Sequence, residues 1–403
     1  MPERSLKVHP DHIQLVKSAF TSSPFPSQQA LATEVGMHRT TVSNYFNRIG
    51  IDRLNFIEIS EKLGLNWEEI ADVELPPEDP YYIEPPIASE CYQEILKPGC
   101  LIRIKAPWQM GKTSLMSGAL NYAQKRGYRT VALNFREAIA DELQNLEGVL
   151  QWFCLSVANT LGVNASVEEH WRKSLGNPKI KCKEYLQKYC LSGEQPLALA
   201  LDELDRLFPY PPIADEVLGM LRTWHEQAKN RQILKQLRLV LVHTELYALP
   251  IHQSPFNVGK DIQLPELTEE EVQELLKQYN LNLEQREIQQ LREVLGGHPY
   301  QVRTVCDRLK QGNITLSEIL TDCTTEAGMF SDHLQRFCQK LKEQPELSET
   351  LSQVVKAENP MPLSEVNRDR ALQLRDLGLV KIQQDQVMPS CELYRRYFRQ
   401  RLQ

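Results

Sequence analysis

The feature that most constrains this fold is an apolar segment, residues 101–105, that runs directly into the loop Ala-Pro-Trp-Gln-Met-Gly-Lys-Thr at residues 106–113. The residues that follow, 114–120, favour a helix. A strand, a glycine-containing loop and a helix in this order are the context of a phosphate-binding P-loop. The segment therefore predicts a nucleotide-binding α/β domain.

Each residue type of the loop suits one part of a nucleotide with its magnesium ion. Backbone N–H groups at a helix N-terminus can surround phosphate oxygens. Lys112 can reach the β and γ phosphates, and the Thr113 hydroxyl can ligate Mg²⁺. The expected cofactor contacts are Trp108, Gln109, Met110, Gly111, Lys112, Thr113 and Ser114.

The loop departs from the consensus at its first position, where Ala106 stands in place of glycine. We expect backbone angles there that alanine tolerates. A chance Gly-Lys-Thr after an apolar run is the alternative reading of the loop alone.

A second motif, the apolar run 197–201 followed by Asp202 and Glu203, weakens that alternative. A buried strand that ends in two acids is typical of a Walker B motif. We expect Asp202 to hold Mg²⁺, usually through water, and Glu203 to polarise the attacking water as general base. The remaining alternative is a strand that ends in a solvated turn.

A third apolar run, residues 239–242, also ends in polar residues. A sensor strand between the two motif strands would bring such residues to the γ-phosphate. Thr244 is the first candidate for this catalytic contact and His243 the second; alternatively, Thr244 merely caps the strand. Together with residues 130–135, these near-continuous apolar runs predict a parallel sheet that is buried on both faces in a three-layer α/β domain.

Changes in composition divide the chain into five predicted segments. Five prolines between residues 74 and 86 favour extended backbone and mark a boundary. Thr268 and the acids after it favour a helix N-terminus. The predicted segments are an all-α domain at 1–73, a proline-rich linker at 74–86, a P-loop core at 87–265, a helical lid at 266–330 and a winged helix at 331–403.

The N-terminal segment resembles a phage-repressor-type helix-turn-helix. Residues 27–46 place small and apolar residues inside two helices, with Gly36 at the turn between them. The second helix would present Arg39, Thr40, Thr41, Ser43 and Asn44 to a DNA major groove. Six basic and four acidic residues in 1–57 give only a small positive charge, so docking to a protein is the alternative.

Gross composition excludes several classes of protein. The 403 residues are 41% hydrophobic and 25% charged, as in ordinary globular domains, and the net charge of −7 restricts any nucleic-acid contact to a local surface. The nine cysteines show no metal-ligand spacing, so we expect mostly buried thiols. No apolar run is long enough to cross a membrane, which indicates a cytoplasmic protein.

Taken together, the motifs resemble those of the AAA-like, STAND-type P-loop ATPases, a bacterial family common in cyanobacteria. The residues that carry this resemblance are 107–115, 201–208, 243–245, 254–259, 296–300 and 393–398. The resemblance implies an ASCE-type three-layer core with a lid and a winged helix, and it implies that Pro299 lies near the adenine. It also implies that nucleotide drives a change from a closed monomer to an open oligomer.

The leading functional hypothesis is a signalling switch that binds ATP or ADP with Mg²⁺, is expected to hydrolyse ATP, and either forms a homo-oligomer or engages a partner protein. One alternative is an ATPase that acts on double-stranded DNA, like origin-recognition or transposition-regulating proteins. Another is a transcription regulator that only binds ATP, but a pure sensor has no need of Glu203.

Overall fold

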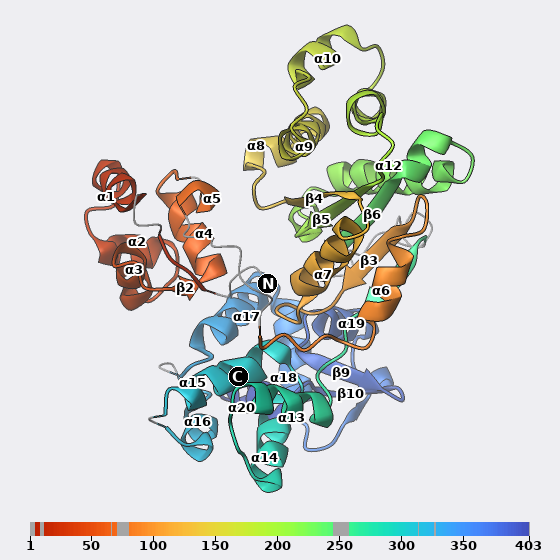
Figure 1. Cartoon of the computed structure of the whole chain (residues 1–403). Coiled ribbons are helices and arrows are strands. Elements are labelled where there is room, and N and C mark those ends of the chain that lie inside the picture. The colour runs from red at the N-terminus through yellow and green to blue at the C-terminus, as the bar shows by residue number, and fades with distance from the viewer. Residues whose placement is uncertain are drawn as a thin grey trace. The chain divides into compact units, whose positions relative to one another are not determined.

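The computed structural model describes residues 5–8, 12–65, 67–70, 80–244, 258–312, 314–325 and 328–402. The chain divides into two compact units, residues 1–82 and 83–403 (Figure 1). Three stretches of the sequence motifs lie outside the described residues: 74–79 of the proline-rich segment, residue 245 and residues 254–257.

The first unit is a small bundle of helices with a two-residue strand pair. Its elements are β1 (Ser5–Leu6), α1 (Ile13–Ser22), α2 (Gln28–Glu34), α3 (Arg39–Phe46), β2 (Ile51–Asp52), α4 (Arg53–Lys62) and α5 (Trp67–Ile70). Leu31 from α2 and Val42 from α3 are fully buried in its core, and Ser27 caps α2 by accepting a hydrogen bond from the N–H of Ala30. The antiparallel pair β1–β2 was not predicted, because two-residue strands carry no sequence periodicity.

The second unit is built on a five-stranded parallel sheet, which confirms the predicted α/β fold. The strands are β3 (Leu101–Lys105), β4 (Arg129–Asn134), β5 (Leu197–Asp202), β6 (Leu237–His243) and β7 (Lys260–Gln263), in the order β4-β5-β6-β3-β7. As predicted, β6 lies between the P-loop strand β3 and the acid-bearing strand β5. The carboxyl ends of these three strands therefore meet at one edge.

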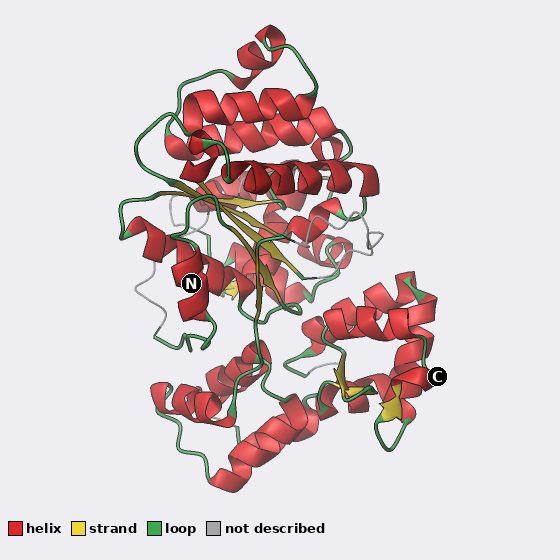
Figure 2. Cartoon of the chain, turned by 90° about the vertical axis from the view of Figure 1, so that its right-hand side faces the viewer, coloured by secondary structure: helices red, strands yellow, loops and turns green. Residues whose placement is uncertain are grey.

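Helices cover both faces of this sheet (Figure 2). The helices of this part of the chain are α6 (Ala88–Glu94), α7 (Lys112–Gln124), α8 (Ala140–Leu143), α9 (Leu146–Leu161), α10 (Val167–Lys173), α11 (Pro178–Tyr185) and α12 (Pro211–Ala228). Alternate residues of β5 enter opposite cores: Leu199 and Leu201 pack with α9 and α12, whereas Ala198 and Ala200 pack with α6 and α7. All residues of β5 and β6 are buried, as a central parallel strand requires.

Four helices follow the sheet: α13 (Glu269–Gln278), α14 (Gln285–Leu295), α15 (Pro299–Lys310) and α16 (Leu316–Asp322). The N-terminus of α13 is a capping box, as expected from its sequence. Thr268 accepts from the N–H of Glu271, and the Glu271 carboxylate accepts from the N–H of Thr268. Pro299 is the first residue of α15, where its missing N–H costs nothing.

The last segment combines four helices with a three-stranded sheet. Its elements are α17 (Ser331–Glu343), α18 (Pro345–Lys356), β8 (Met361–Pro362), α19 (Arg368–Asp376), β9 (Val380–Gln383), β10 (Gln386–Pro389) and α20 (Glu392–Arg401). The expected hairpin is present as β9 and β10. The apolar run 377–382 predicts a strand from Leu377, but the strand begins at Val380, because Leu377 is the C-cap of α19.

Two expectations from composition can be compared with the structure. All nine cysteines are free, and seven of them are buried, as predicted. Among the described residues, no helix has both the length and the apolar composition needed to cross a bilayer.

Candidate functional site

The predicted P-loop joins β3 to α7 through a loop with two left-handed residues. Gln109 has a φ of 61° and Gly111, the N-cap of α7, has a φ of 94°. Ala106 does not have a positive φ, so alanine is tolerated at the consensus glycine position. The Lys112 ammonium donates hydrogen bonds to the carbonyls of Ala106 and Pro107, each at 3.0 Å, which holds it over the loop.

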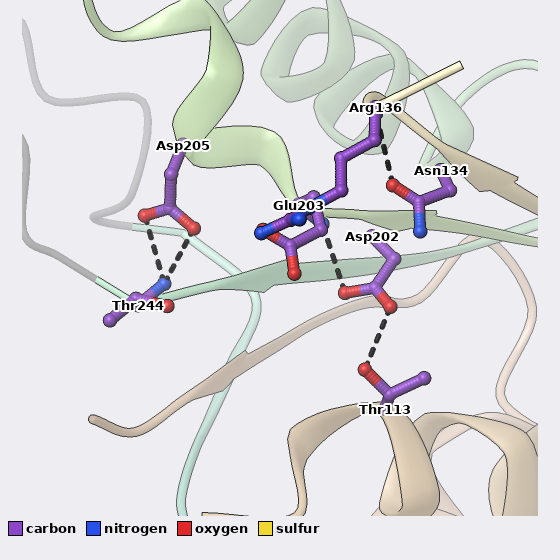
Figure 3. A network of polar contacts seen from close by, with 7 residues as sticks. All are labelled: Thr113, Asn134, Arg136, Asp202, Glu203, Asp205 and Thr244. Atoms are coloured by element: carbon purple, nitrogen blue, oxygen red, sulfur yellow. Dashed lines mark hydrogen bonds and ion pairs between the residues drawn. The ribbon is translucent and has the colours of Figure 1, made fainter. Parts of the chain in front are cut away.

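The predicted metal ligands Thr113 and Asp202 are in direct contact, although they are far apart in the sequence (Figure 3). The Thr113 hydroxyl donates to a carboxylate oxygen of Asp202 at 2.8 Å. The other Asp202 oxygen accepts from the N–H of Glu203 at 2.9 Å. Burial raises the pKa of Asp202, and the nearby Glu203 charge raises it further. Burial lowers the pKa of Lys112, against the opposing effect of the three acids Asp205, Glu203 and Asp202.

These groups fit a magnesium ion. Mg²⁺ favours oxygen ligands and is usually held by one or two carboxylates together with substrate phosphates and water. Thr113 and Asp202 supply one hydroxyl and one carboxylate at a shared position. Among the described residues no three His, Cys, Asp or Glu side chains are arranged so that they could hold a metal ion by themselves.

Glu203 follows β5 in the left-handed region, with a φ of 55°. Such a backbone conformation costs energy for a residue with a side chain and is frequent at functional sites. The Glu203 carboxylate lies 3.4 Å from Nε of Arg136, which comes just after β4. Sequence reasoning did not identify Arg136, because no motif marks the residues that follow β4.

Thr244 lies at the end of β6, as predicted. Its N–H donates to both carboxylate oxygens of Asp205, each at 2.9 Å (Figure 3). Asp205 was not singled out from the sequence, although it lies only two residues after Glu203. The second candidate, His243, is almost fully buried, and burial lowers its pKa to about 4. His243 is therefore neutral near pH 7.

The other predicted cofactor contacts are distributed around the loop. Met110 is buried, and Ser114 lies in the first turn of α7. The side chains of Trp108 and Gln109 contact residues of α17. Pro299 follows His298 in the chain. Nε2 of His298 lies 3.2 Å from the carbonyl oxygen of Trp108, a residue of the loop. Helix α15 thus begins beside the loop that joins β3 to α7.

The candidate DNA-contacting residues belong to the separate N-terminal unit. Arg39 and Thr40 are exposed at the start of α3, and Thr41, Ser43 and Asn44 are partly exposed along it. None of the five is needed for the core of this unit.

A family model and one solved structure support the assignment of the fold. A family model described as an AAA-like domain matches residues 70–400. Among solved structures, a Walker-type ATPase of Pyrococcus abyssi matches with a TM-score of 0.54 and 14% identity over 79% of this chain and 99% of that chain. The ORC2 protein of Aeropyrum pernix, in its ADPNP–ADP complexes, matches with a TM-score of 0.49 and 16% identity over 80% of this chain and 97% of that chain. No curated protein matches the sequence.

Proposed function

This chain belongs to the AAA-like domain family, and on that basis we propose that it is an ATP-binding and ATP-hydrolysing molecular switch. The observation that carries the proposal is the Thr113–Asp202 hydrogen bond at the N-terminus of α7. It brings the P-loop hydroxyl and the strand-end carboxylate to one point, with Glu203 next in the chain. This arrangement suits a phosphate chain with its magnesium ion.

In the proposed mechanism, loop N–H groups and Lys112 bind the phosphates, while Thr113 and Asp202 hold Mg²⁺. When bound, Mg²⁺ supplies charge neutralisation to the phosphate oxygens. Glu203 orients a water molecule and accepts its proton. In this proposal Thr244, whose N–H donates to Asp205, contacts the terminal phosphate. Pro299 is the proposed adenine neighbour.

The term switch refers to the elements that surround this site. The lid helices, and the final segment with its helices and hairpin, fit the lid and winged helix of a STAND-type ATPase. In this proposal nucleotide state changes how these segments dock and allows the chain to assemble with copies of itself or with a partner protein. The product of the reaction is then a conformation rather than a metabolite.

Calorimetric titration of the full chain with ATP, in Mg²⁺ and in EDTA, tests nucleotide binding. We expect Lys112→Ala to weaken binding at least about tenfold, because one charge-assisted contact is worth about 1.5–3 kcal/mol. Asp202→Asn should reduce the difference between Mg²⁺ and EDTA. Lys125→Ala, an exposed lysine at the C-cap of α7, is the control. Unchanged affinity in Lys112→Ala would refute the phosphate assignment.

A second function, DNA targeting, is favoured by one observation on the N-terminal unit. Ser27 caps α2, Gly36 occupies the turn with a φ of 63°, and α3 exposes Arg39 and Thr40 at its start. This geometry suits a helix-turn-helix whose second helix enters a major groove.

Binding of labelled duplex DNA to the full chain, measured across a range of salt concentrations, tests this function. A phosphate contact from Arg39 predicts weaker binding and a shallower salt dependence in Arg39→Ala. If wild type shows no affinity for duplex DNA at low salt, the unit is better explained as a protein-docking module.

A further inference from the structure

The phosphate loop is connected to the C-terminal segment by a hydrogen bond from one of its own side chains. The Gln109 side-chain oxygen lies 2.7 Å from Nδ1 of His333 on α17. Gln109 is also the loop residue other than glycine that takes a positive φ. The side chain thus ties a strained point of the loop backbone to a helix more than 200 residues away in the sequence.

His333 is itself held in a buried polar chain. Its Nε2 lies 2.7 Å from the Tyr394 hydroxyl on α20, and that hydroxyl accepts from the Gln301 amide on α15 at 2.9 Å. All three side chains are at most 2% exposed. Buried polar groups that are satisfied by one another define a single arrangement, because breaking any link leaves the other groups unpaired.

The direction of each hydrogen bond follows from the chemistry of the groups. An amide oxygen can only accept, so Nδ1 of His333 carries the hydrogen that bonds to Gln109. Burial lowers the pKa of His333 well below its usual value, so the ring is neutral near pH 7. Nε2 therefore accepts from Tyr394, and Tyr394 in turn accepts from Gln301. The lid helix α15, the C-terminal helices α20 and α17, and the phosphate loop form one directional chain with a neutral histidine.

The two loop residues before Gln109 contact the same segment. The Trp108 and His333 rings stack with an interplanar angle of 4°, and the Arg336 guanidinium lies 4.5 Å from the centre of the Trp108 ring. Pro107 packs on Gly378, where a Cβ atom would lie only 2.6 Å from the proline Cβ. Three consecutive residues of the loop are therefore in contact with residues 331–402.

We propose that the Gln109–His333 hydrogen bond couples nucleotide binding at the loop to the docking of α17 and α20. The inference rests on the proposed function, since it assigns a regulatory contact to the same phosphate site. A change of the loop backbone around bound phosphates moves Gln109 and breaks or remakes the whole chain. Because coupling is reciprocal, docking of the C-terminal helices changes nucleotide affinity by the same factor that nucleotide changes docking.

Amide hydrogen exchange of the full chain, with and without saturating MgADP, tests this coupling. In wild type we expect MgADP to change exchange in α17 and α20. In Gln109→Ala, MgADP still binds, with an affinity changed by about 5- to 150-fold, the usual range for coupled sites. The change of exchange in α17 and α20 is lost. Gln335→Ala, which removes an exposed glutamine of α17, is the matched control and should behave as wild type.

Two variants of His333 separate coupling from general damage to the core. The Asn side chain can place an N–H near Nδ1, whereas the Gln side chain reaches the position of Nε2. His333→Asn, which keeps the hydrogen bond to Gln109, should retain the response of α17 to MgADP. His333→Gln, which keeps only the contact at the position of Nε2, should lose it, although both variants remove the same ring.

Two results would overturn the inference while leaving the proposed function intact. One is MgADP binding to wild type without any change of exchange in α17 and α20. The other is a change of exchange in α17 and α20 on MgADP binding that is as large in Gln109→Ala as in wild type. Absence of MgADP binding to wild type would instead remove the proposed function, and the coupling with it.

Discussion

Glu203 has a strained backbone conformation, and its side chain forms an ion pair. Its left-handed φ turns the chain directly after β5, and its carboxylate meets Nε of Arg136 at 3.4 Å. Both side chains are about one quarter exposed, so solvent screens the pair and its contribution is about 1 kcal/mol at most. Arg136 thus engages in an ion pair the carboxylate that the mechanism needs as a base.

We therefore expect Arg136→Ala to raise ATP turnover by about fivefold, the equivalent of about 1 kcal/mol, with nucleotide affinity unchanged. Steady-state kcat and equilibrium affinity, measured side by side, separate the two effects. Arg126→Ala, which removes an exposed arginine of the same unit, is the control. A fall of kcat to the level of Glu203→Gln would show instead that Arg136 takes part in hydrolysis.

His243 makes the stability of the protein depend on pH. Its pKa is about 4 in the folded chain and 6.5 ordinarily, with burial as the main cause. Below pH 6.5 the unfolded chain gains a proton that the folded chain does not, so the free energy of unfolding decreases as the pH falls toward 4. At pH 5 this residue lowers the free energy of unfolding by about 2 kcal/mol.

Urea unfolding of wild type and His243→Gln at pH 7.5 and pH 5 measures this contribution. We expect the difference between the two pH values to be smaller in the variant by about 2 kcal/mol, because glutamine does not titrate. Equal pH dependence in both proteins would mean that His243 is protonated in the folded state.

At the level of helices and strands, the elements that the sequence predicts correctly are those whose own residues determine them. Strands β5 and β6 are apolar throughout because both faces are covered, and this makes them visible in the sequence. The edge strand β7 was missed because Lys260, Asp261 and Gln263 surround a single buried residue, Ile262. Its pairing with β3 is a tertiary effect that composition does not reveal.

Helix caps are local as well, and that of α13 gives a test at this scale. Removing the Thr268 side chain leaves the N–H of Glu271 without its acceptor, so Thr268→Ala should lower the free energy of unfolding by about 1 kcal/mol. Thr321→Ala is the control, since Thr321 is an exposed threonine that bonds within α16 and caps no helix. If thermal unfolding shows that both variants lose the same free energy of unfolding, Thr268 has no capping role.

In the molecule as a whole, the sequence predicts those residues of the candidate site that lie in a motif at the end of one strand. Lys112 and Thr113 follow β3, Asp202 ends β5 and Glu203 follows it, so parallel strand order alone brings them to one edge. Arg136 and His333 were not predictable in this way. They come from other segments and contact the site through their side chains, and no motif in the sequence marks such contacts.

ATP hydrolysis at this edge of the sheet is tested by ATP turnover in Glu203→Gln. Glutamine keeps the size of the side chain but cannot accept a proton from water. ATP turnover by the full chain with Mg²⁺ should fall at least about 100-fold in Glu203→Gln, the usual contribution of a general base, while ATP binding persists. Turnover equal to that of wild type would mean that Glu203 is not the general base of an ATPase site.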